Sequence, residues 1–399
     1  MDIAFITSGY LPVPPSKGGA VENLIYNLIK ANEFHDENKF TVYSIYDSYN
    51  QNFSNTKIKY IKVSFAYKIF DLFLYSVAKY ILKKEHLISY RYFFQRMDFL
   101  KKVGKDLSKN EYDRVILENN VVMFKALEQK DNFEKYKDKI YYHAHNEPGK
   151  TLGYEKYFDK LTKVVSVSDY ITEQYKKIIN DFNVKFQTVH NVVDETLFMK
   201  NISIEESLKI KEQLGICNNA VTLLFTGRIS EEKGIFELIE ALSKIKTNQY
   251  NLLIVGKSFY GANVKDNFEI KLQEAADKLK GNIVFTGFVD YKEMYKYYQL
   301  SDICILPSVW NEPCALTIIE CVASGTPLIT TNTGGTPENT VDSTILLNIY
   351  GLVDNLASKL EFYIDNKSAL ENFKKNAQAQ RNRYGSLQDY YNEFIESMD

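Results

Sequence analysis

The chain contains few of the residues on which metal and redox chemistry depend. Its 399 residues include five histidines, four cysteines and one tryptophan, and no two cysteines form a Cys-x-x-Cys pair. Cys304 and Cys321 lie in apolar segments, so we expect buried thiols in a reducing compartment. No Asp-x-Asp occurs in the chain, although that pattern often holds a divalent ion beside a diphosphate. We therefore predict no bound metal.

Two further absences concern location. No apolar run approaches the ~18 residues that a membrane-spanning helix needs. The chain opens with Met1-Asp2 and a strand pattern, which is not a signal peptide. We expect a cytoplasmic protein. Its 45% hydrophobic and 25% charged residues are typical of a globular protein.

Short strand patterns alternate with helical patterns through both halves of the chain. The strands are expected at 3–7, 40–45, 114–117, 139–143 and 164–167, and then at 221–225, 252–255, 283–286, 303–306 and 327–331. A polar stretch at 200–219 separates the two sets. This alternation predicts an α/β protein with two Rossmann-like doubly wound domains facing across a cleft. We place them at residues 1–199 and 200–383.

The most informative segment follows the predicted strand 303–306. It reads as loop, helix, strand and Gly-Gly turn, a βαβ pattern whose functional atoms gather where the strands end. Pro313 suits the first position of the helix, because its missing N–H would have no partner there. The N–H groups of Ala315 and Leu316 would then be free to hold an anion such as a nucleotide diphosphate.

Two carboxylates flank this predicted anion site. Glu312 lies just before the helix and Glu320 lies two turns into it. They would accept hydrogen bonds from hydroxyls on either side of the anion, a sugar on one side and a ribose on the other. Taken alone, a Glu-x7-Glu pair more often lies on a solvated helix face. The flanking strands favour a nucleotide-sugar site.

A diphosphate leaving group needs positive charge, which the protein must supply if no metal does. Arg228 and Lys233 follow the predicted strand 221–225, where a guanidinium and an ammonium can grip two phosphates. An Arg-x4-Lys pair alone is usually a surface pair. Gly256 and Lys257 end the next strand and are expected near the nucleotide.

The first half carries two more candidate features. Gly18 and Gly19 precede a predicted helix at 20–30 and allow a ligand to approach the backbone closely. No G-x-G-x-x-G occurs there, which argues against a simple NAD-binding domain. His145 follows the strand 139–143, and His143 points to the same side of it. A zinc site at this His-x-His pair would need further ligands that the sequence does not identify.

These segments together resemble the retaining GT-B glycosyltransferases of family 4, also called glycosyl transferases group 1. The resemblance extends along nearly the whole chain and is most specific in the second half. It implies metal-independent transfer of a sugar, with retention of configuration, from a nucleotide-sugar to an acceptor hydroxyl. UDP-sugars are the expected donors and GDP-sugars the alternative. A C-terminal helix at about 384–399 is expected to pack back on the first domain.

The resemblance also implies roles for the candidate residues. Arg228 and Lys233 would bind the diphosphate, Glu312 the sugar hydroxyls and Glu320 the ribose. His145 would contact the sugar near the reacting carbon. The chain departs from the family where Phe-Gly often follows Glu-Pro. Here Cys314 and Ala315 stand, so a methyl group is added where the sugar diphosphate approaches.

Basic and aromatic residues are concentrated between residues 57 and 109. This window holds thirteen Lys/Arg and four Asp/Glu, a net charge of +9 against −11 for the rest of the chain. Such a window suits an anionic membrane surface better than nucleic acid, or the aromatics simply pack the first domain. A membrane-surface acceptor would suit a lipid-linked oligosaccharide in capsular or cell-wall polysaccharide biosynthesis.

Two other functions stay open at this point. A non-catalytic relative, such as a glycan-binding or coat-type protein, could keep the same fold. A nucleotide-sugar 2-epimerase would consume the donor without an acceptor, but no matching acid/base carboxylates are visible. A binding protein would not need the whole set of polar candidates that this chain keeps, so the set favours the transferase. The set is Arg228, Lys233, Glu312, Glu320 and His145.

Overall fold

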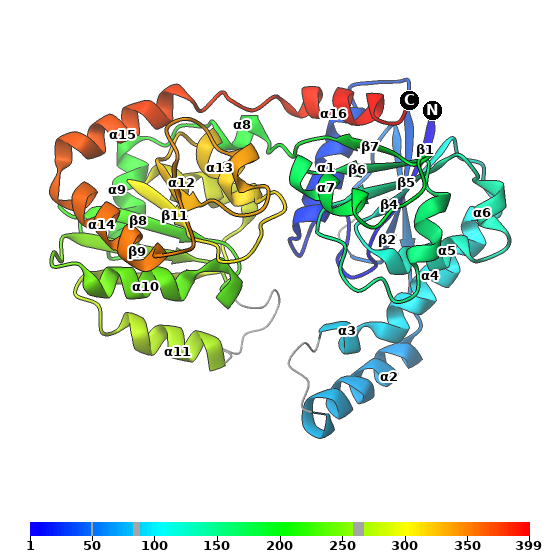
Figure 1. The fold of residues 1–399 in the computed structure, drawn as a ribbon, viewed down its shortest axis with the longest axis horizontal. Coiled ribbons are helices and arrows are strands. Elements are labelled where there is room, and N and C mark those ends of the chain that lie inside the picture. The colour runs from blue at the N-terminus through cyan, green and yellow to red at the C-terminus, as the bar shows by residue number, and fades with distance from the viewer. Residues whose placement is uncertain (49–50, 83–87, 258–266) are drawn as a thin grey trace. The chain divides into compact units, whose positions relative to one another are not determined.

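The computed structural model describes residues 1–48, 51–82, 88–257 and 267–399. The chain forms two compact units (Figure 1). One comprises Met1–His190 together with Gln388–Asp399, and the other comprises Asn191–Leu387.

The first unit is built on a parallel sheet of seven strands in the order β3-β2-β1-β4-β5-β6-β7. The strands are β1 (Asp2–Ile6), β2 (Lys39–Ile45), β3 (Thr56–Ile61), β4 (Arg114–Glu118), β5 (Ile140–Ala144), β6 (Lys163–Ser166) and β7 (Lys185–Thr188). The central strands β1, β4 and β5 are almost wholly buried, as expected for a parallel sheet covered on both faces. The helical segments are α1 (Ala20–Asn32), α2 (Phe65–Ser76), η1 (Val77–Ile81), α3 (Ile88–Arg91), α4 (Phe93–Leu107), η2 (Val121–Met123), α5 (Phe124–Leu127), α6 (Asn132–Lys135), η3 (Glu155–Lys160) and α7 (Asp169–Lys176).

The second unit repeats this architecture with six parallel strands in the order β10-β9-β8-β11-β12-β13. The strands are β8 (Val221–Thr226), β9 (Tyr250–Val255), β10 (Asn282–Gly287), β11 (Ile303–Leu306), β12 (Leu328–Thr331) and β13 (Ile345–Leu347). The helical segments are α8 (Glu195–Phe198), α9 (Ile204–Gln213), η4 (Glu231–Lys233), α10 (Ile235–Lys244), α11 (Asn267–Ala276), η5 (Tyr291–Glu293), α12 (Met294–Gln299), α13 (Leu316–Ala323), η6 (Thr336–Asn339), α14 (Leu352–Asp365) and α15 (Lys367–Ala379). Apolar residues of α10, α14 and α15 form one core with residues of β8, β9 and β11.

The last helix, α16 (Leu387–Glu396), lies against the first unit. The hydroxyl of Tyr391 donates to Asn32 Oδ1 at 2.8 Å and accepts from Asn38 Nδ2 at 2.8 Å. Beyond the helix, the carbonyl oxygen of Met398 accepts from Tyr141 Oη at 2.7 Å. These buried hydrogen bonds fix the C-terminal segment on the first unit.

The predicted α/β class is confirmed, and each of the ten predicted strands is present. Three strands were not predicted, namely β3, β7 and β13. Each lies at the edge of its sheet and is only partly buried. A half-exposed edge strand lacks the continuous apolar run by which buried strands are recognised.

Candidate functional site

The carboxyl ends of β8 and β9 meet at two glycines. Gly227 and Gly256 have φ angles of 132° and 144°, which side-chain-bearing residues rarely adopt. A Cβ atom on Gly256 would collide with the carbonyl oxygen of Gly227. Just beyond them, the N–H of Ile229 donates to the carbonyl oxygen of Lys257 at 3.3 Å. The turns that carry Arg228 and Lys257 are therefore held side by side at this edge of the sheet.

Lys233 and Glu312, both predicted site residues, form an ion pair. Lys233 Nζ lies 2.6 Å from Glu312 Oε1, and the Ser308 hydroxyl donates to the same oxygen. The Glu312 side chain is 4% exposed and that of Lys233 is 22% exposed. The close approach depends on Gly234, because a Cβ there would collide with the carbonyl oxygen of Pro307. The unit thus holds an ammonium group directly beside a buried carboxylate.

Arg228 lies in the same loop but has another partner. Its guanidinium pairs with Glu232 four residues later, and both side chains are more than one third exposed. An exposed pair of this kind is worth little in free energy. Arg228 can therefore exchange Glu232 for an incoming anion at small cost.

The helix α13 begins later than the sequence predicted. It starts at Leu316, with Ala315 as the N-cap residue in an extended conformation, so the predicted start at Pro313 was wrong. Tertiary contacts hold the preceding residues outside the helix. The carbonyl oxygen of Glu312 accepts from the N–H of Gly335 at 2.7 Å, in the Gly-Gly turn after β12.

Buried Cys314 belongs to the same extended segment. Its Sγ donates to Asn339 Oδ1 at 3.3 Å, and burial raises its pKa to about 12, so the thiol is inert. No side chain caps the N-terminus of α13. The N–H groups of Leu316 and Thr317 are in its first turn, where no intrahelical acceptor exists. The available backbone donors are thus shifted by one residue from the predicted Ala315 and Leu316.

Glu320 lies in the second turn of α13 and is buried. It accepts a hydrogen bond from the Tyr298 hydroxyl at 2.7 Å. Burial raises the pKa of Glu320 to about 7, although the Tyr298 hydrogen bond opposes this shift. Near neutral pH the carboxyl group is therefore partly protonated and can either donate to or accept from a hydroxyl group.

This pKa predicts how Glu320→Gln changes stability with pH. Because the folded-state pKa exceeds the unfolded value, ionisation costs stability as pH rises from about 4.5 through 7. We expect Glu320→Gln to be on the order of 1–3 kcal/mol more stable than the parent at pH 8 and nearly equal to it at pH 4.5. Urea unfolding at both pH values measures the difference. Glu274→Gln, on the exposed side of α11, is the control, and a gain independent of pH would contradict the prediction.

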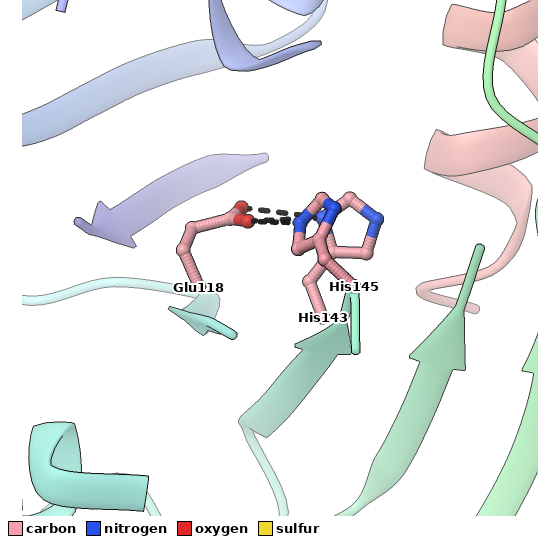
Figure 2. A group of neighbouring side chains, drawn as sticks. All are labelled: Glu118, His143 and His145. Atoms are coloured by element: carbon pink, nitrogen blue, oxygen red, sulfur yellow. Dashed lines mark hydrogen bonds and ion pairs between the residues drawn. The ribbon is translucent and has the colours of Figure 1, made fainter. Parts of the chain in front are cut away.

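In the first unit, Glu118 joins the predicted His145 and its neighbour His143 (Figure 2). Glu118 Oε2 lies 2.8 Å from His145 Nε2 and 3.1 Å from His143 Nδ1. All three side chains are buried. Burial would raise the pKa of Glu118, but His143 and His145 lower it to about 2. Burial and the neighbouring His143 together lower the pKa of His145 to about 4, although Glu118 opposes this shift. At neutral pH, a neutral His145 imidazole therefore lies beside an ionised Glu118 carboxylate.

Gly18 and Gly19 precede α1 with φ angles of 76° and 115°. A Cβ on Gly19 would collide with the carboxylate of Glu22. Burial raises the pKa of Glu22 to about 7. The space beside Gly19 is thus occupied by the protein's own carboxyl group.

The predicted residues are therefore distributed over both units. Lys233 and Glu312 are in direct contact, whereas Arg228, Lys257 and Glu320 have other partners or neighbours in the second unit. Three partners of predicted residues were not among the candidates, namely Ser308, Tyr298 and Glu118. Glu118 is the last residue of the buried strand β4, and Ser308 comes two residues after the buried strand β11. This position at a strand end is the signal by which both could have been found.

Comparison with known protein families gives a match for most of the second unit. Residues 206–380 match the family "Glycosyl transferases group 1". This match lies wholly within the second unit. The matched residues include Lys233, Glu312 and Glu320.

Sequence similarity to individual proteins extends beyond this domain. The chain is 27% identical to spore coat protein SA of Bacillus subtilis over 352 residues, which cover 85% of this chain and 82% of that protein. It is 22% identical to the lipopolysaccharide 1,2-N-acetylglucosaminetransferase of Salmonella typhimurium, over 85% of this chain and 82% of that enzyme. The predicted enzyme class, a glycosyltransferase, is confirmed.

Solved structures confirm the fold. The chain superposes on Anabaena Alr3699/HepE, solved in complex with UDP and glucose, with a TM-score of 0.69 and 16% identity, over 99% of this chain and 98% of that one. The glycosyltransferase therefore has the GT-B fold that the sequence predicted.

Proposed function

We propose that this glycosyltransferase is a retaining, metal-independent member of family 4 that transfers a sugar from a nucleotide-sugar to an acceptor hydroxyl. The observation that carries the proposal is the Lys233–Glu312 pair beside the uncapped N-terminus of α13. It combines a cation, a hydroxyl acceptor and backbone N–H donors within one unit. Those are the groups that a sugar diphosphate needs.

In this proposal the protein itself neutralises the leaving group. Lys233 and Arg228 bind the diphosphate, and the N–H groups of Leu316 and Thr317 donate to it at the positive end of the helix dipole. Fixed donors that face the developing charge favour the transition state without reorganisation. Lys233 must give up part of its ion pair with Glu312 when it binds the diphosphate. The Glu312 carboxylate is then available to accept hydrogen bonds from sugar hydroxyls.

The remaining roles in the proposal are those that the resemblance to family 4 implies. Glu320 accepts from the ribose, and Gly256 and Lys257 lie near the nucleotide. His145 contacts the sugar near the reacting carbon. The acceptor attacks from the face that the diphosphate leaves, and the diphosphate takes the acceptor proton. UDP is the favoured nucleotide, because HepE, a structural neighbour, was solved with UDP and glucose.

Donor binding can be tested without knowledge of the acceptor. Thermal unfolding is measured with UDP-, GDP-, ADP- and dTDP-sugars in EDTA. A nucleotide-sugar present at 100 times its dissociation constant adds about 2.7 kcal/mol to stability, so we expect a clear midpoint increase with one nucleotide class. Arg228→Ala should abolish it, and Arg383→Ala in the same unit should not. No increase with any donor would favour a non-catalytic protein, and an increase only with added metal would contradict metal independence.

We also propose that the acceptor is presented at an anionic membrane surface, on its cytoplasmic face, as in capsular or cell-wall polysaccharide biosynthesis. The supporting feature is an apolar surface on α2 and η1, which we call the α2 surface. Its exposed apolar side chains are Phe65, Tyr67, Ile69, Phe70, Leu72, Phe73, Tyr80 and Ile81, and their exposed fractions run from 37% to 73%. A concentration of exposed apolar side chains of this kind on one helical segment marks an interaction site.

Charge favours a bilayer as the occupant of the α2 surface. Exposed basic residues occur before, within and after α2 and η1 along the chain. They are Lys62, Lys68, Lys79, Arg91, Lys101, Lys102 and Lys105. The described carboxylates of the window 57–109 are all engaged: Asp71 is buried, and Asp98 and Asp106 pair with lysines. Glu85 of that window lies outside the described residues. No helix in the described parts of the chain has the length and hydropathy to cross a membrane.

A further inference from the structure

Glu118 and its neighbour Asn119 fix the end of β5 on the end of β4. Glu118 is the register partner of His143 across the two parallel strands, and His145, two residues on, reaches the same carboxylate. Asn119 has a φ of 63°, which asparagine tolerates better than most residues. Its N–H donates to the carbonyl oxygen of His143 at 2.9 Å, and its Oδ1 accepts from the N–H of His145 at 2.9 Å.

The hydrogen bonds determine which nitrogen of each ring carries the proton. An ionised carboxylate can only accept hydrogen bonds. His145 Nε2 and His143 Nδ1 both face Glu118 Oε2, so both must donate to it. In a neutral imidazole the other nitrogen is then an acceptor. The acceptor of His145 is Nδ1, which makes no hydrogen bond within the described residues.

The two histidines differ in whether their second ring nitrogen can accept a hydrogen bond from a ligand. His143 Nε2 is buried without a hydrogen-bond partner in the described structure, and its ring packs on Phe394 of α16 at a centroid distance of 5.0 Å. The His145 side chain keeps about 5% exposure. His143 therefore completes the packing of the unit, whereas His145 retains one polar atom for a ligand.

We infer that Glu118 is a positioning residue that holds the proton of His145 on Nε2 and thereby presents Nδ1 as a hydrogen-bond acceptor to a substrate hydroxyl. The identity of that hydroxyl, on the donor sugar, rests on the proposed function. The ring orientation and the tautomer rest on the geometry of Glu118 alone. The same carboxylate excludes the opposite tautomer, which would direct an N–H at the hydroxyl.

The three side chains also form a possible set of metal ligands. Their atoms lie at hydrogen-bond distances of 2.8 and 3.1 Å, so each proton already has its acceptor without an ion. The geometry thus favours a hydrogen-bonded group, and metal content becomes one outcome of the test.

The tautomer can be read on the free full-length protein by NMR. With five histidines in the chain, ¹⁵N-histidine labelling and two-bond ¹⁵N–¹H correlations resolve the two ring nitrogens of each. The signal lost in His145→Asn is that of His145. At neutral pH we expect a protonated Nε2 and an unprotonated Nδ1, and a saturating donor sugar should shift the Nδ1 signal. Protonation of Nδ1 in the free protein would overturn the inference.

Two substitutions separate positioning from simple structural support. Glu118→Leu removes both acceptor oxygens and should lower kcat by ~10²-fold with a mixed tautomer, since misplacement of a contacting group costs about this much. Glu118→Gln keeps one acceptor oxygen and should keep the Nε2–H tautomer and a kcat within ~10-fold of the parent. Tyr136→Phe is the control, because it removes the buried hydrogen bond to the Leu107 carbonyl oxygen, 2.8 Å long, elsewhere in the unit.

The outcomes are distinct. If Glu118→Leu loses no more activity than Tyr136→Phe at an equal loss of thermal midpoint, Glu118 is only structural and the inference fails. Stoichiometric bound metal that disappears in Glu118→Leu would also overturn it. Absence of sugar transfer by the parent protein would contradict the proposed function, whereas the tautomer measured on the free protein decides the role of Glu118 independently.

Discussion

Lys233→Ala is expected to lower turnover by ~10²–10³-fold, because it removes a fixed positive charge from the diphosphate as the bond breaks. The expectation rests on the position of Lys233 Nζ, 2.6 Å from Glu312 and held there by the close approach of Gly234 to Pro307, the residue after β11. The effect should fall on kcat, since charge on the leaving group increases in the transition state. Donor turnover is measured with coupled detection of the released nucleotide.

A loss of stability could imitate this result, because Lys233→Ala leaves Glu312 buried without its cation. The double variant Lys233→Met with Glu312→Gln removes both charges and keeps the volume. We expect it to recover the thermal midpoint but not the activity. If the double variant recovers activity as well, the loss in Lys233→Ala was one of folding.

Arg228→Ala tests the second cation without this complication. Its side chain is 43% exposed, so stability should change little while turnover again falls by ~10²-fold or more. Glu232→Gln is the matched control, since it removes the partner of Arg228 and keeps the guanidinium. Near-parent rates in both Arg228→Ala and Lys233→Ala would overturn the proposed donor site.

The patterns of buried strands predicted the α/β fold, and the enzyme class was implied by the family resemblance of the residues that follow those strands. Lys233 and Glu312 follow β8 and β11 in sequence, and they meet because those strands are neighbours in the sheet. The start of α13 could not be predicted in this way. Pro313 alone favours a helix that begins there. The carbonyl oxygen of Glu312 is instead bonded to the N–H of Gly335, 23 residues later in the chain, and this tertiary contact outweighs the helix preference of Pro313.

The same reasoning explains why Glu118 was overlooked. One glutamate at the end of an apolar strand has no partner in sequence, and its two histidines lie 25 and 27 residues further on. Whether Glu118 and His143 are neighbours depends on the strand register, because only the parallel pairing of β4 with β5 places Glu118 opposite His143. The edge strand β13 was missed for a related reason, since its burial depends on the neighbouring β12.

Replacement of Phe65, Leu72 and Phe73 by serine is expected to weaken binding to anionic vesicles by ~100-fold or more. Each side chain is more than half exposed, and inserting it into the acyl region is worth about 1 kcal/mol or more. One buried side chain attaches the helix to α4. Asp71, on its opposite side, is buried and accepts from the backbone N–H groups of Phe94 and Gln95 at 2.8 and 3.0 Å.

Binding is measured by co-sedimentation with phosphatidylcholine vesicles, with and without phosphatidylglycerol. The matched control replaces Phe182, Ile204 and Tyr350 by serine, three exposed apolar residues outside the α2 surface, and should bind like the parent. Lys68→Glu with Lys79→Glu should weaken binding by about 1 kcal/mol or more per residue and reduce its salt dependence.

The alternatives predict different results. No binding at low salt would remove the membrane proposal. Binding that depends on the lysines but not on the three apolar residues would mean adsorption without insertion, and would leave the α2 surface unexplained. A parent dimer that the triple serine variant converts to a monomer, seen by light scattering, would show that a second copy covers the surface. Only joint dependence on apolar contact and anionic lipid agrees with an acceptor delivered at the bilayer, because that geometry needs both insertion and charge.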